Sequence, residues 1–346
     1  MAEPKLTPMM QHYRDVKARY RDSLLFYRLG DFYEMFFEDA VTAARELEIA
    51  LTGRDCGMEE RAPMCGVPYH AAQNYITRLI QKGYKVAICD QLEDPSQAKG
   101  LVRRDVTRVV TPGTITEPGM LEEKRNNFLM ALHHRGGCYG LAVADVTTGE
   151  CYATQIAWGN TARRVVDEVA RYRPAELLVD RDLPDGAELL QPLRELLHIR
   201  PTPVSEWVEE PVGLSERVAP YADQFPEGWE LPRMAAGMLL GYLEENQKAV
   251  RTPVERIACY TLDTYMAIDS ASRRNLELTE TMREGKKKGS LLWVLDRTGT
   301  SMGGRMLRKW LEQPLLDPDA IGERLDAVAE LKDRFIVRNE LMEMLR

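Results

Sequence analysis

The stretch that decides the fold is LLFYRLGDFYEMFF, residues 24–37. Two apolar runs of strand length flank Gly30-Asp31, a pair typical of a tight turn. Because side chains alternate between the faces of a strand, the second run places Phe32, Glu34 and Phe36 together on one face. The other face of this run is aromatic as well. The sequence therefore predicts two adjoining strands, the second of which carries a carboxylate among aromatic rings.

Both periodicities of an α/β unit occur in the first third of the chain. Helical spacing of apolar residues recurs at 7–20, 40–47 and 72–80. Strand-like runs are 24–29, 32–37, 84–89 and 106–111. Gly83 follows the last helical segment, and glycine is favoured just after a helix. The sequence thus predicts a compact mixed α/β unit that closes near Pro112-Gly113.

The rest of the chain divides into a second α/β region and a helical one. Polar residues 117–127 predict a linker. After it, strands are expected at 128–132, 139–154 and 176–179, and helices at 162–172 and 234–243. Prolines predict that 200–232 is largely irregular. Beyond about residue 255 strand signals vanish, so the last region is predicted to be all-α.

Composition excludes several classes of protein. A chain of 346 residues with 29% charged and 44% hydrophobic residues can form two or three domains with real cores. Its longest nearly uncharged apolar stretch, 234–243, is about half of a membrane span, and the N-terminus lacks an apolar signal core. Six cysteines occur without a Cys-x-x-Cys pair, which indicates reduced thiols in a cytosol.

The charge distribution constrains any nucleic-acid partner. The net charge is −8, and the first 115 residues carry equal numbers of basic and acidic side chains. Nonspecific binding to DNA usually needs a basic surface, because neutralising phosphates releases counterions. We therefore expect any DNA contact to be local, and weak DNA affinity for the chain alone.

Two segments resemble phosphate sites. Gly299 to Met306 has the glycine spacing of a Walker A loop, but Arg305 replaces the lysine and Met306 the magnesium-binding hydroxyl. A connection between helices is the favoured interpretation, and no ATP hydrolysis is expected. Lys286-Lys287-Lys288 could touch a phosphate, although a solvated loop is the expected structure for so short a charge run.

Four carboxylates of the second region leave an alternative open. Asp145, Glu150, Glu176 and Asp180 lie at or near predicted strand ends, where a ribonuclease-H-like nuclease would bind two metal ions. Asp145 to Gly149 also has ordinary hairpin-turn chemistry, which is the favoured interpretation. A metal-dependent nuclease is kept as the second hypothesis. For Phe32, pattern alone predicts a core residue, because an exposed phenylalanine is uncommon without a function.

Several motifs resemble the MutS family of DNA mismatch-recognition proteins. Residues 29–34, Leu-Gly-Asp-Phe-Tyr-Glu, resemble the family's Phe-x-Glu mismatch-reading motif. Other stretches similar to family signatures are 63–71, 93–95, 98–100, 110–114, 273–278, 295–298 and 302–303. The resemblance covers nearly the whole chain. Asp90 stands where the family pattern has Glu.

The resemblance implies a multidomain fold. It predicts a mixed α/β mismatch-binding domain at 1–116, a linker at 117–127, an α/β ribonuclease-H-like connector domain at 128–250 and the all-α start of the core, or lever, domain at 251–346. The connector is expected to have no nuclease role. Because the chain ends in a helical pattern without a capping residue, we expect it to be the N-terminal part of a longer protein.

The resemblance also implies a site. Phe32 is expected to enter the minor groove and stack on one base of a mispair, and Glu34 to hydrogen-bond that base. Phosphates around the groove favour a protonated carboxyl there, which can donate a hydrogen bond. Candidate contacts to the DNA backbone are Arg54, Lys99, Arg103, Arg104 and Arg108.

Further expectations concern partners and cofactors. The family's ATPase, with its ATP and Mg²⁺, and its dimerisation region belong to a C-terminal domain, so no catalytic, cofactor or metal residue is expected in this chain. The expected partners are mismatched double-stranded DNA and a MutL-type repair protein bound through the connector domain. The longer protein is expected to be a homodimer, the chain alone a monomer. The expected location is the cytoplasm, at the nucleoid.

Overall fold

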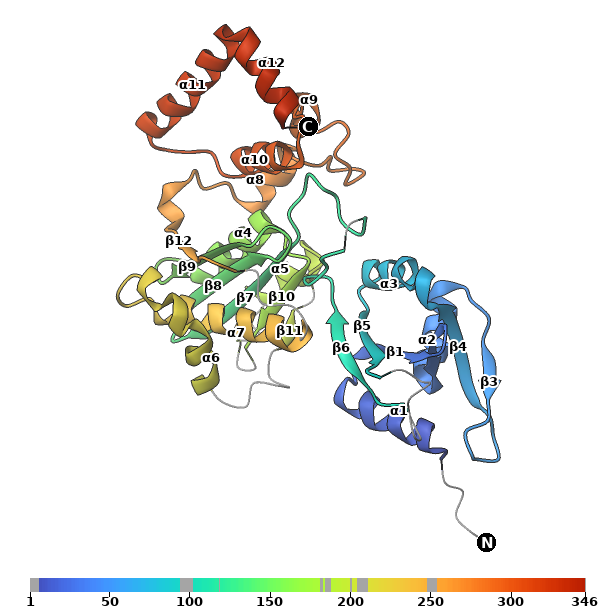
Figure 1. Ribbon diagram of the computed structural model, residues 1–346. Helices are drawn as coiled ribbons and strands as arrows, with labels where there is room; N and C mark the ends of the chain where they lie inside the picture. The colour runs from blue at the N-terminus through green and yellow to red at the C-terminus, as the bar shows by residue number, and fades with distance from the viewer. Residues whose placement is uncertain are drawn as a thin grey trace. The chain divides into compact units, whose positions relative to one another are not determined.

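The computed structural model describes residues 6–93, 102–117, 119–180, 183, 188–199, 201–203, 211–247 and 254–345. The chain forms two compact units (Figure 1). The first consists of Met1–Ile115 with Gly241–Thr252, and the second of Thr116–Leu240 with Pro253–Arg346. Within the first unit, the side-chain amide of Gln247 donates to the carbonyl oxygen of Thr114 at 3.1 Å, which joins its two chain segments.

The first unit is built on a six-stranded mixed sheet in the order β3-β4-β2-β1-β5-β6. Its strands are β1 (Ser23–Leu29), β2 (Phe32–Phe36), β3 (Thr52–Arg54), β4 (Ala62–Pro68), β5 (Lys85–Gln91) and β6 (Arg104–Val110). Only the β1–β5 pair is parallel within this sheet. The turn Gly30-Asp31 sets the register of β1 and β2, in which Leu29 faces Phe32 and Tyr27 faces Glu34.

Helices pack on both faces of this sheet. They are α1 (Pro8–Arg19), α2 (Phe37–Leu47), η1 (Tyr69–Ala71) and α3 (Ala72–Gln81). α1 covers the face that carries Tyr27 and Phe36, and their side chains share one core cluster with Tyr13. α2 lies on the other face, where the Cys65 thiol contacts the carbonyl oxygen of Ala40 at 3.4 Å. The segments predicted as helices and strands in this part of the chain are found, but β3 and β4 were not predicted.

A buried carboxylate ties the helices to the sheet. Asp39, in the first turn of α2, is 5% exposed and accepts hydrogen bonds from the Leu25 N–H at 3.0 Å and the Tyr13 hydroxyl at 3.1 Å. Lys17 Nζ lies 2.9 Å from its second oxygen. The Tyr13 oxygen in turn accepts from the Phe36 N–H at 3.2 Å. Because a buried charge is tolerated when it is paired and hydrogen-bonded, this network fixes α1, β1 and the end of β2 together.

The second unit is built on another six-stranded sheet, in the order β11-β10-β7-β8-β9-β12. Its strands are β7 (Phe128–Arg135), β8 (Cys138–Asp145), β9 (Glu150–Ile156), β10 (Glu176–Val179), β11 (Thr202–Pro203) and β12 (Ala258–Cys259). β7, β8 and β9 form an antiparallel meander. β10 runs parallel to β7, β11 parallel to β10, and β12 parallel to β9.

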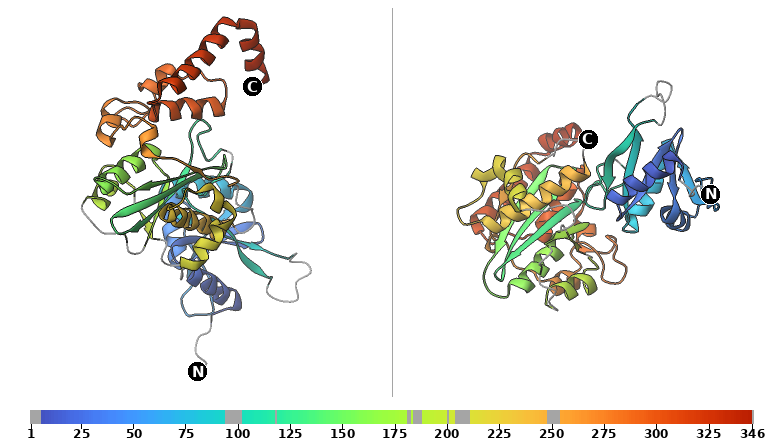
Figure 2. Two further views of the ribbon diagram at one scale, coloured as in Figure 1. Left: turned by 90° about the vertical axis from the view of Figure 1, so that its left-hand side faces the viewer. Right: turned by 90° about the horizontal axis from the view of Figure 1, so that it is seen from below.

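Helices cover both faces of this sheet. α4 (Thr161–Tyr172) packs Val165, Val166 and Val169 against one face. The first turns of α7 (Glu230–Asn246) lie on the other face (Figures 1 and 2). They approach β8 so closely that a Cβ atom on Gly140 would lie 2.1 Å from the carbonyl carbon of Leu231. Glycine is therefore required at this point of β8.

Two predictions for this unit are wrong. The segment 200–232 was expected to be largely irregular, but it contains α6 (Pro211–Val218), η2 (Ala219–Gln224) and the start of α7. Prolines stand at or near the N-terminal ends of these helices, where the missing N–H costs nothing. The absence of strands beyond residue 255 is also wrong, because β12 pairs with β9. A two-residue strand has no periodicity that sequence analysis could detect.

The remaining described elements of the second unit are helices. They are α5 (Leu190–Glu195), η3 (Leu262–Thr264), α8 (Ser270–Asn275), α9 (Leu291–Leu295), α10 (Ser301–Glu312), α11 (Pro318–Asp333) and α12 (Phe335–Met344). Exposed apolar side chains gather on α11 and α12, among them Leu325, Phe335 and Ile336. Among the described helices, none has the length and apolar character to cross a membrane.

The Asp39 network predicts a stability effect. Tyr13→Phe keeps the aromatic ring but removes the hydroxyl that serves both Asp39 and the Phe36 N–H. We expect the free energy of unfolding to fall by about 1–3 kcal/mol, measured by urea denaturation, because buried polar groups lose a partner. Tyr84→Phe removes a hydroxyl from Glu46, which keeps Lys82 as a partner, and should have a much smaller effect. Equal losses in the two variants would contradict this role for Asp39.

Candidate nucleic-acid interface

Phe32 is the first residue of β2 and lies on the sheet face that α1 covers only in part. Its side chain is 46% exposed, whereas Phe36 on the same face is fully buried. α1 covers this face at the Phe36 end, where the rings of Tyr13 and Phe36 pack edge to face with centroids 5.0 Å apart. The prediction from pattern alone that Phe32 is a core residue is therefore wrong. The pattern could not reveal where along β2 the covering helix ends.

The turn before Phe32 is braced by residues that sequence analysis missed. Gly30 has a φ of 57°, a conformation that glycine adopts without strain. Arg28 Nε donates to the Gly30 carbonyl oxygen at 2.5 Å, and its guanidinium lies 3.7 Å from the centre of the Tyr69 ring. The Tyr69 N–H donates to the carbonyl oxygen of Asp31 at 2.9 Å. Tyr69 lies in the family-like stretch 63–71, which was the available signal for it.

Glu34 is paired with Arg54, one of the predicted backbone contacts. Glu34 Oε2 lies 2.5 Å from Arg54 Nη1, and the two side chains are 17% and 40% exposed. Glu34 pairs with Gly66 on β4, and a Cβ atom added to Gly66 would lie 3.4 Å from Glu34 Cγ. The structure thus joins two residues that were predicted separately.

On the opposite face of β2, Tyr33 links three strands. Its hydroxyl donates to Asp90 Oδ1 on β5 at 2.6 Å, and the Thr107 hydroxyl on β6 donates to Asp90 Oδ2 at 2.9 Å. Burial, with Asp90 as a further cause, raises the pKa of Tyr33 to about 12, so the phenol stays protonated at neutral pH. Asp90, where the chain departs from the family pattern, therefore accepts hydrogen bonds from side chains of β2 and β6.

The other predicted backbone contacts occupy different environments. Arg103 is exposed just before β6. Arg108 lies on β6 opposite Ile88, on the sheet face away from Glu34. Arg104 is 8% exposed, and its guanidinium donates to the carbonyl oxygens of Arg28 at 2.9 Å and Val102 at 2.8 Å. We correct the prediction for Arg104, because its charge is buried and bound to the backbone. Lys99 lies outside the described residues.

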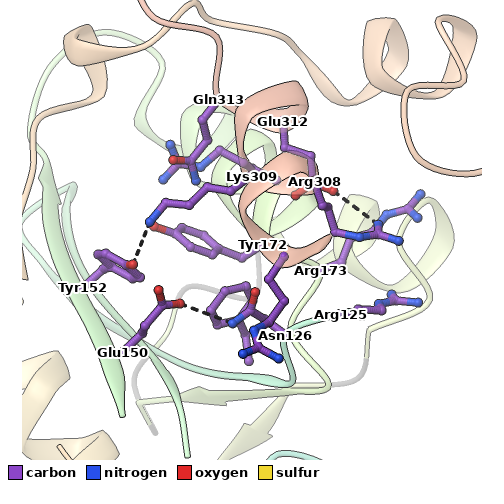
Figure 3. A pocket seen from close by; sticks show the side chains of 13 residues that line it. Arg125, Asn126, Glu150, Tyr152, Tyr172, Arg173, Arg308, Lys309, Glu312 and Gln313 are labelled. Carbon is purple, nitrogen blue, oxygen red and sulfur yellow. Dashed lines mark hydrogen bonds and ion pairs between the residues drawn. The ribbon is translucent and has the colours of Figure 1, made fainter. Parts of the chain in front are cut away.

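Asp145 and Glu150 face each other across the β8–β9 hairpin, with Asn126 between them. The Asn126 amide donates to Asp145 Oδ2 at 2.7 Å and to Glu150 Oε2 at 3.2 Å, and Figure 3 shows the second contact. Asp145 Oδ1 accepts from the N–H and the hydroxyl of Thr147 at 2.9 and 2.6 Å. The contacts with Thr147 are those of an ordinary turn, as the favoured interpretation predicted.

Glu176 and Asp180 do not join this pair. Glu176 is in register with Leu129, and Leu129 with Ala144, so Glu176 lies on the face opposite to Asp145. Asp180 follows the other end of β10 and accepts from the His134 N–H at 2.8 Å. The described residues contain no group of three or more His, Cys, Asp or Glu that could hold a metal ion. The structure therefore gives no support to the nuclease alternative.

The Walker-like segment connects two helices. The Thr300 hydroxyl caps α10 by accepting from the Gly303 N–H at 3.0 Å. A Cβ atom on Gly304 would lie 2.6 Å from the Lys124 side chain, which fills the space beside the turn. Lys124 Nζ donates to the carbonyl oxygen of Thr298 at 2.9 Å. Gly304 therefore packs against a protein side chain, and the segment is a connection between helices, as the favoured interpretation predicted.

Two of the three lysines at 286–288 have carboxylate partners. Lys286 lies 3.1 Å from Glu284, and Lys287 lies 2.5 Å from Asp296. The hydrogen bond from Lys287 is the main reason that the pKa of Asp296 lies well below its usual value. These contacts place the lysine run within a loop of the second unit.

A charged pocket lies between α4, α10 and the start of β7 (Figure 3). Lys309 Nζ donates to the Tyr152 hydroxyl at 2.7 Å, and Arg173 pairs with Glu280 at 2.5 Å. Burial lowers the pKa of Lys309 and raises that of Glu312. Both groups thus lose part of their preference for the charged form. We interpret the pocket as a polar contact region between α10 and the part of the second unit that contains the sheet and α4.

Three family models match successive parts of the chain. They are MutS domain I at residues 7–118, MutS domain II at 127–255 and MutS domain III at 271–346. This is the order of a multidomain protein with mixed α/β content. The chain belongs to the MutS family, as the motifs around Phe32 indicated.

Relatives named DNA mismatch repair protein MutS match almost the whole chain. The protein of Ruminiclostridium cellulolyticum is 54% identical over 99% of the chain and 39% of its own length. That of Acetivibrio thermocellus is 52% identical over 99% of the chain and 40% of its length. That of Alkaliphilus oremlandii is 48% identical over 99% of the chain and 40% of its own length. The chain thus spans about two fifths of these relatives.

The contacts of Asp145 predict a structural role. Asp145→Asn should lower the free energy of unfolding by about 1–3 kcal/mol, because a buried oxygen that accepts hydrogen bonds becomes an amide nitrogen. Mg²⁺ or Mn²⁺ should leave the melting temperature of the unsubstituted chain unchanged. Asp263→Asn, at a 93% exposed side chain, is the control. A metal-dependent rise in melting temperature that Asp145→Asn abolishes would restore the nuclease hypothesis.

Proposed function

We propose that the first unit recognises mispaired or unpaired bases in duplex DNA, for DNA mismatch repair. The observation that carries this proposal is Phe32, a half-exposed aromatic ring on a braced turn beside a carboxylate. A large apolar side chain held out at the end of a buried strand is suited to insertion into another molecule. Support also comes from the relatives, which are named DNA mismatch repair protein MutS.

The proposed mechanism rests on a difference in deformation energy. Phe32 enters the minor groove as a wedge, unstacks a base step and kinks the duplex toward the major groove. Unstacking costs a few kcal/mol for a paired step and less where pairing is already poor. A correctly paired duplex thus rejects the wedge without any base-specific contact. The braced turn keeps Phe32 ordered before it meets DNA.

Glu34 supplies a polar contact beside the wedge. It lies on the same face of β2, two residues from Phe32 and about 6–7 Å along the strand. In the minor groove a carboxyl group faces phosphates and loses water, and both effects favour its protonated form. A protonated Glu34 donates a hydrogen bond to a base acceptor. Arg54, Arg103 and Arg108 remain proposed contacts to the DNA backbone.

For the second unit we propose the role of a connector with a ribonuclease-H-like sheet, no nuclease activity and a docking surface for a MutL-type repair protein. The relatives are more than twice as long as this chain, and we propose that ATP hydrolysis, Mg²⁺ binding and homodimerisation belong to the part of such proteins that the chain does not span. The chain alone is then a monomer that binds DNA weakly. Its proposed location is the cytoplasm, at the nucleoid.

Phe32→Ala should abolish the preference for mispaired over paired DNA. Stacking of a base on an aromatic ring is worth about 1–3 kcal/mol, enough to account for a modest preference. Because Phe32 is half-exposed, the loss of stability should be about 1 kcal/mol or less. Fluorescence anisotropy with a G·T duplex and its paired control at low salt measures binding, and thermal unfolding measures stability.

Phe36→Ala is the matched control for this experiment. It removes a fully buried ring from the same face of β2 and should cost about 3–5 kcal/mol of stability. A comparable loss of stability for Phe32→Ala would favour a core role for Phe32. An unchanged preference for the mispaired duplex would refute the wedge.

Glu34→Gln should retain binding of mispaired DNA and raise affinity for paired DNA. The amide is a neutral donor of nearly the same shape, so it keeps the base contact but removes the charge that phosphates repel. Specificity should fall as a result, because a repulsive element against the wrong partner is lost. Glu34→Ala should also lose the base contact. Equal weakening of paired and mispaired binding by Glu34→Gln would contradict this role.

A further inference from the structure

The ion pair of Glu34 and Arg54 lies on the far side of Glu34 from Phe32. The β4 residues that pair with Arg54, Glu34 and Phe32 are Ala62, Gly66 and Pro68, in that order along the strand. Glu34 therefore stands between the other two residues. Its carboxylate leans across Gly66 toward Arg54 at 2.5 Å. A base stacked on Phe32 would require Glu34 to turn the opposite way.

Arg54 is also accessible to a second anion. It ends β3, an edge strand of the sheet, and its side chain is 40% exposed, against 17% for Glu34. The guanidinium group is a planar fork that binds phosphate as readily as carboxylate. A duplex seated on Phe32 brings phosphates to this part of the unit. The phosphate can replace Glu34 as the partner of Arg54, so that neither charge is left alone.

We propose that Glu34 and Arg54 form a latch that opens when DNA binds, with Arg54 passing from Glu34 to a phosphate and Glu34 turning to the base at Phe32. This inference rests on the proposed function of the first unit and adds a regulatory step to it. Arg54 is then a positioning residue that holds Glu34 in a retracted state until DNA is present. The exchange makes the base contact conditional on a backbone contact.

The latch has a thermodynamic consequence that a permanent ion pair lacks. If the pair exists in the free chain and not in the complex, its free energy opposes binding. Removing either partner then removes that cost, and removing the second partner gains nothing further. The effects of Arg54→Gln and Glu34→Gln on DNA affinity are therefore non-additive, with a coupling equal in size and opposite in sign to the coupling in stability.

The test is a pair of double-mutant cycles on the 346-residue chain. Unfolding of the free chain and the dissociation constant for a G·T duplex are measured for the unsubstituted chain, both single variants and the double variant. For a partly exposed pair we expect a coupling of about 1.5- to 5-fold in the unfolding equilibrium constant. The same fold-change is expected in affinity, where Glu34→Gln should favour binding more in the presence of Arg54 than with Arg54→Gln.

Arg19→Gln is the matched control, because it removes one positive charge from the same unit and breaks the pair of Arg19 with Asp105. It should show no coupling to Glu34→Gln in either measurement. Additive effects on affinity, with coupling in stability, would mean that the pair survives in the complex and would overturn the latch. No preference of the unsubstituted chain for the G·T duplex would instead overturn the proposed function, while the stability cycle would still report the ion pair.

Discussion

The first unit depends on one buried carboxylate. Asp39 sits at the start of α2 and receives hydrogen bonds or charge from α1, β1 and the lysine at position 17. Such a group is costly to bury unless its oxygens are satisfied, so α1, β1 and α2 must keep their relative positions. The Tyr13 hydroxyl extends this constraint to the last residue of β2. One end of β2 is therefore anchored in the buried core of the unit.

The other end of β2 is anchored differently, and the contrast explains how a binding residue can be both exposed and ordered. Hydrophobic contact with α1 stops short of Phe32, so the ring projects into solvent. Its backbone is held instead by polar contacts of the turn, from Arg28 and from the Tyr69 N–H. Side chains of β2 thus change from buried at Phe36 to exposed at Phe32. The same strand contributes to the core at one end and carries an exposed binding residue at the other. Glu34, midway between Phe32 and Phe36, is partly buried.

Sequence analysis predicted the paired strands around Gly30-Asp31 because their periodicity and turn chemistry are local properties. It failed where the outcome depends on distant contacts: the exposure of Phe32 is decided by how far α1 covers β2, and the burial of Arg104 involves the carbonyl oxygen of Arg28 on β1. The short strand β12 carries no periodic signal. Family motifs identified Phe32 and Glu34 as candidates, but no motif indicated that Arg54 would meet Glu34, since twenty residues separate them in the sequence.

The first unit is discontinuous in sequence, and this has a consequence for how the chain is made. Tyr242, whose ring centre lies 5.5 Å from Lys85 Nζ, and Gln247, which donates to Thr114, complete a unit whose main part ends at Ile115. On a ribosome these residues emerge on the order of ten seconds after the first segment, at about 5–20 residues per second. During that interval the sheet that carries Phe32 lacks the contacts with Tyr242 and Gln247. Domains of this kind depend on the nascent chain being kept soluble until translation brings their second segment.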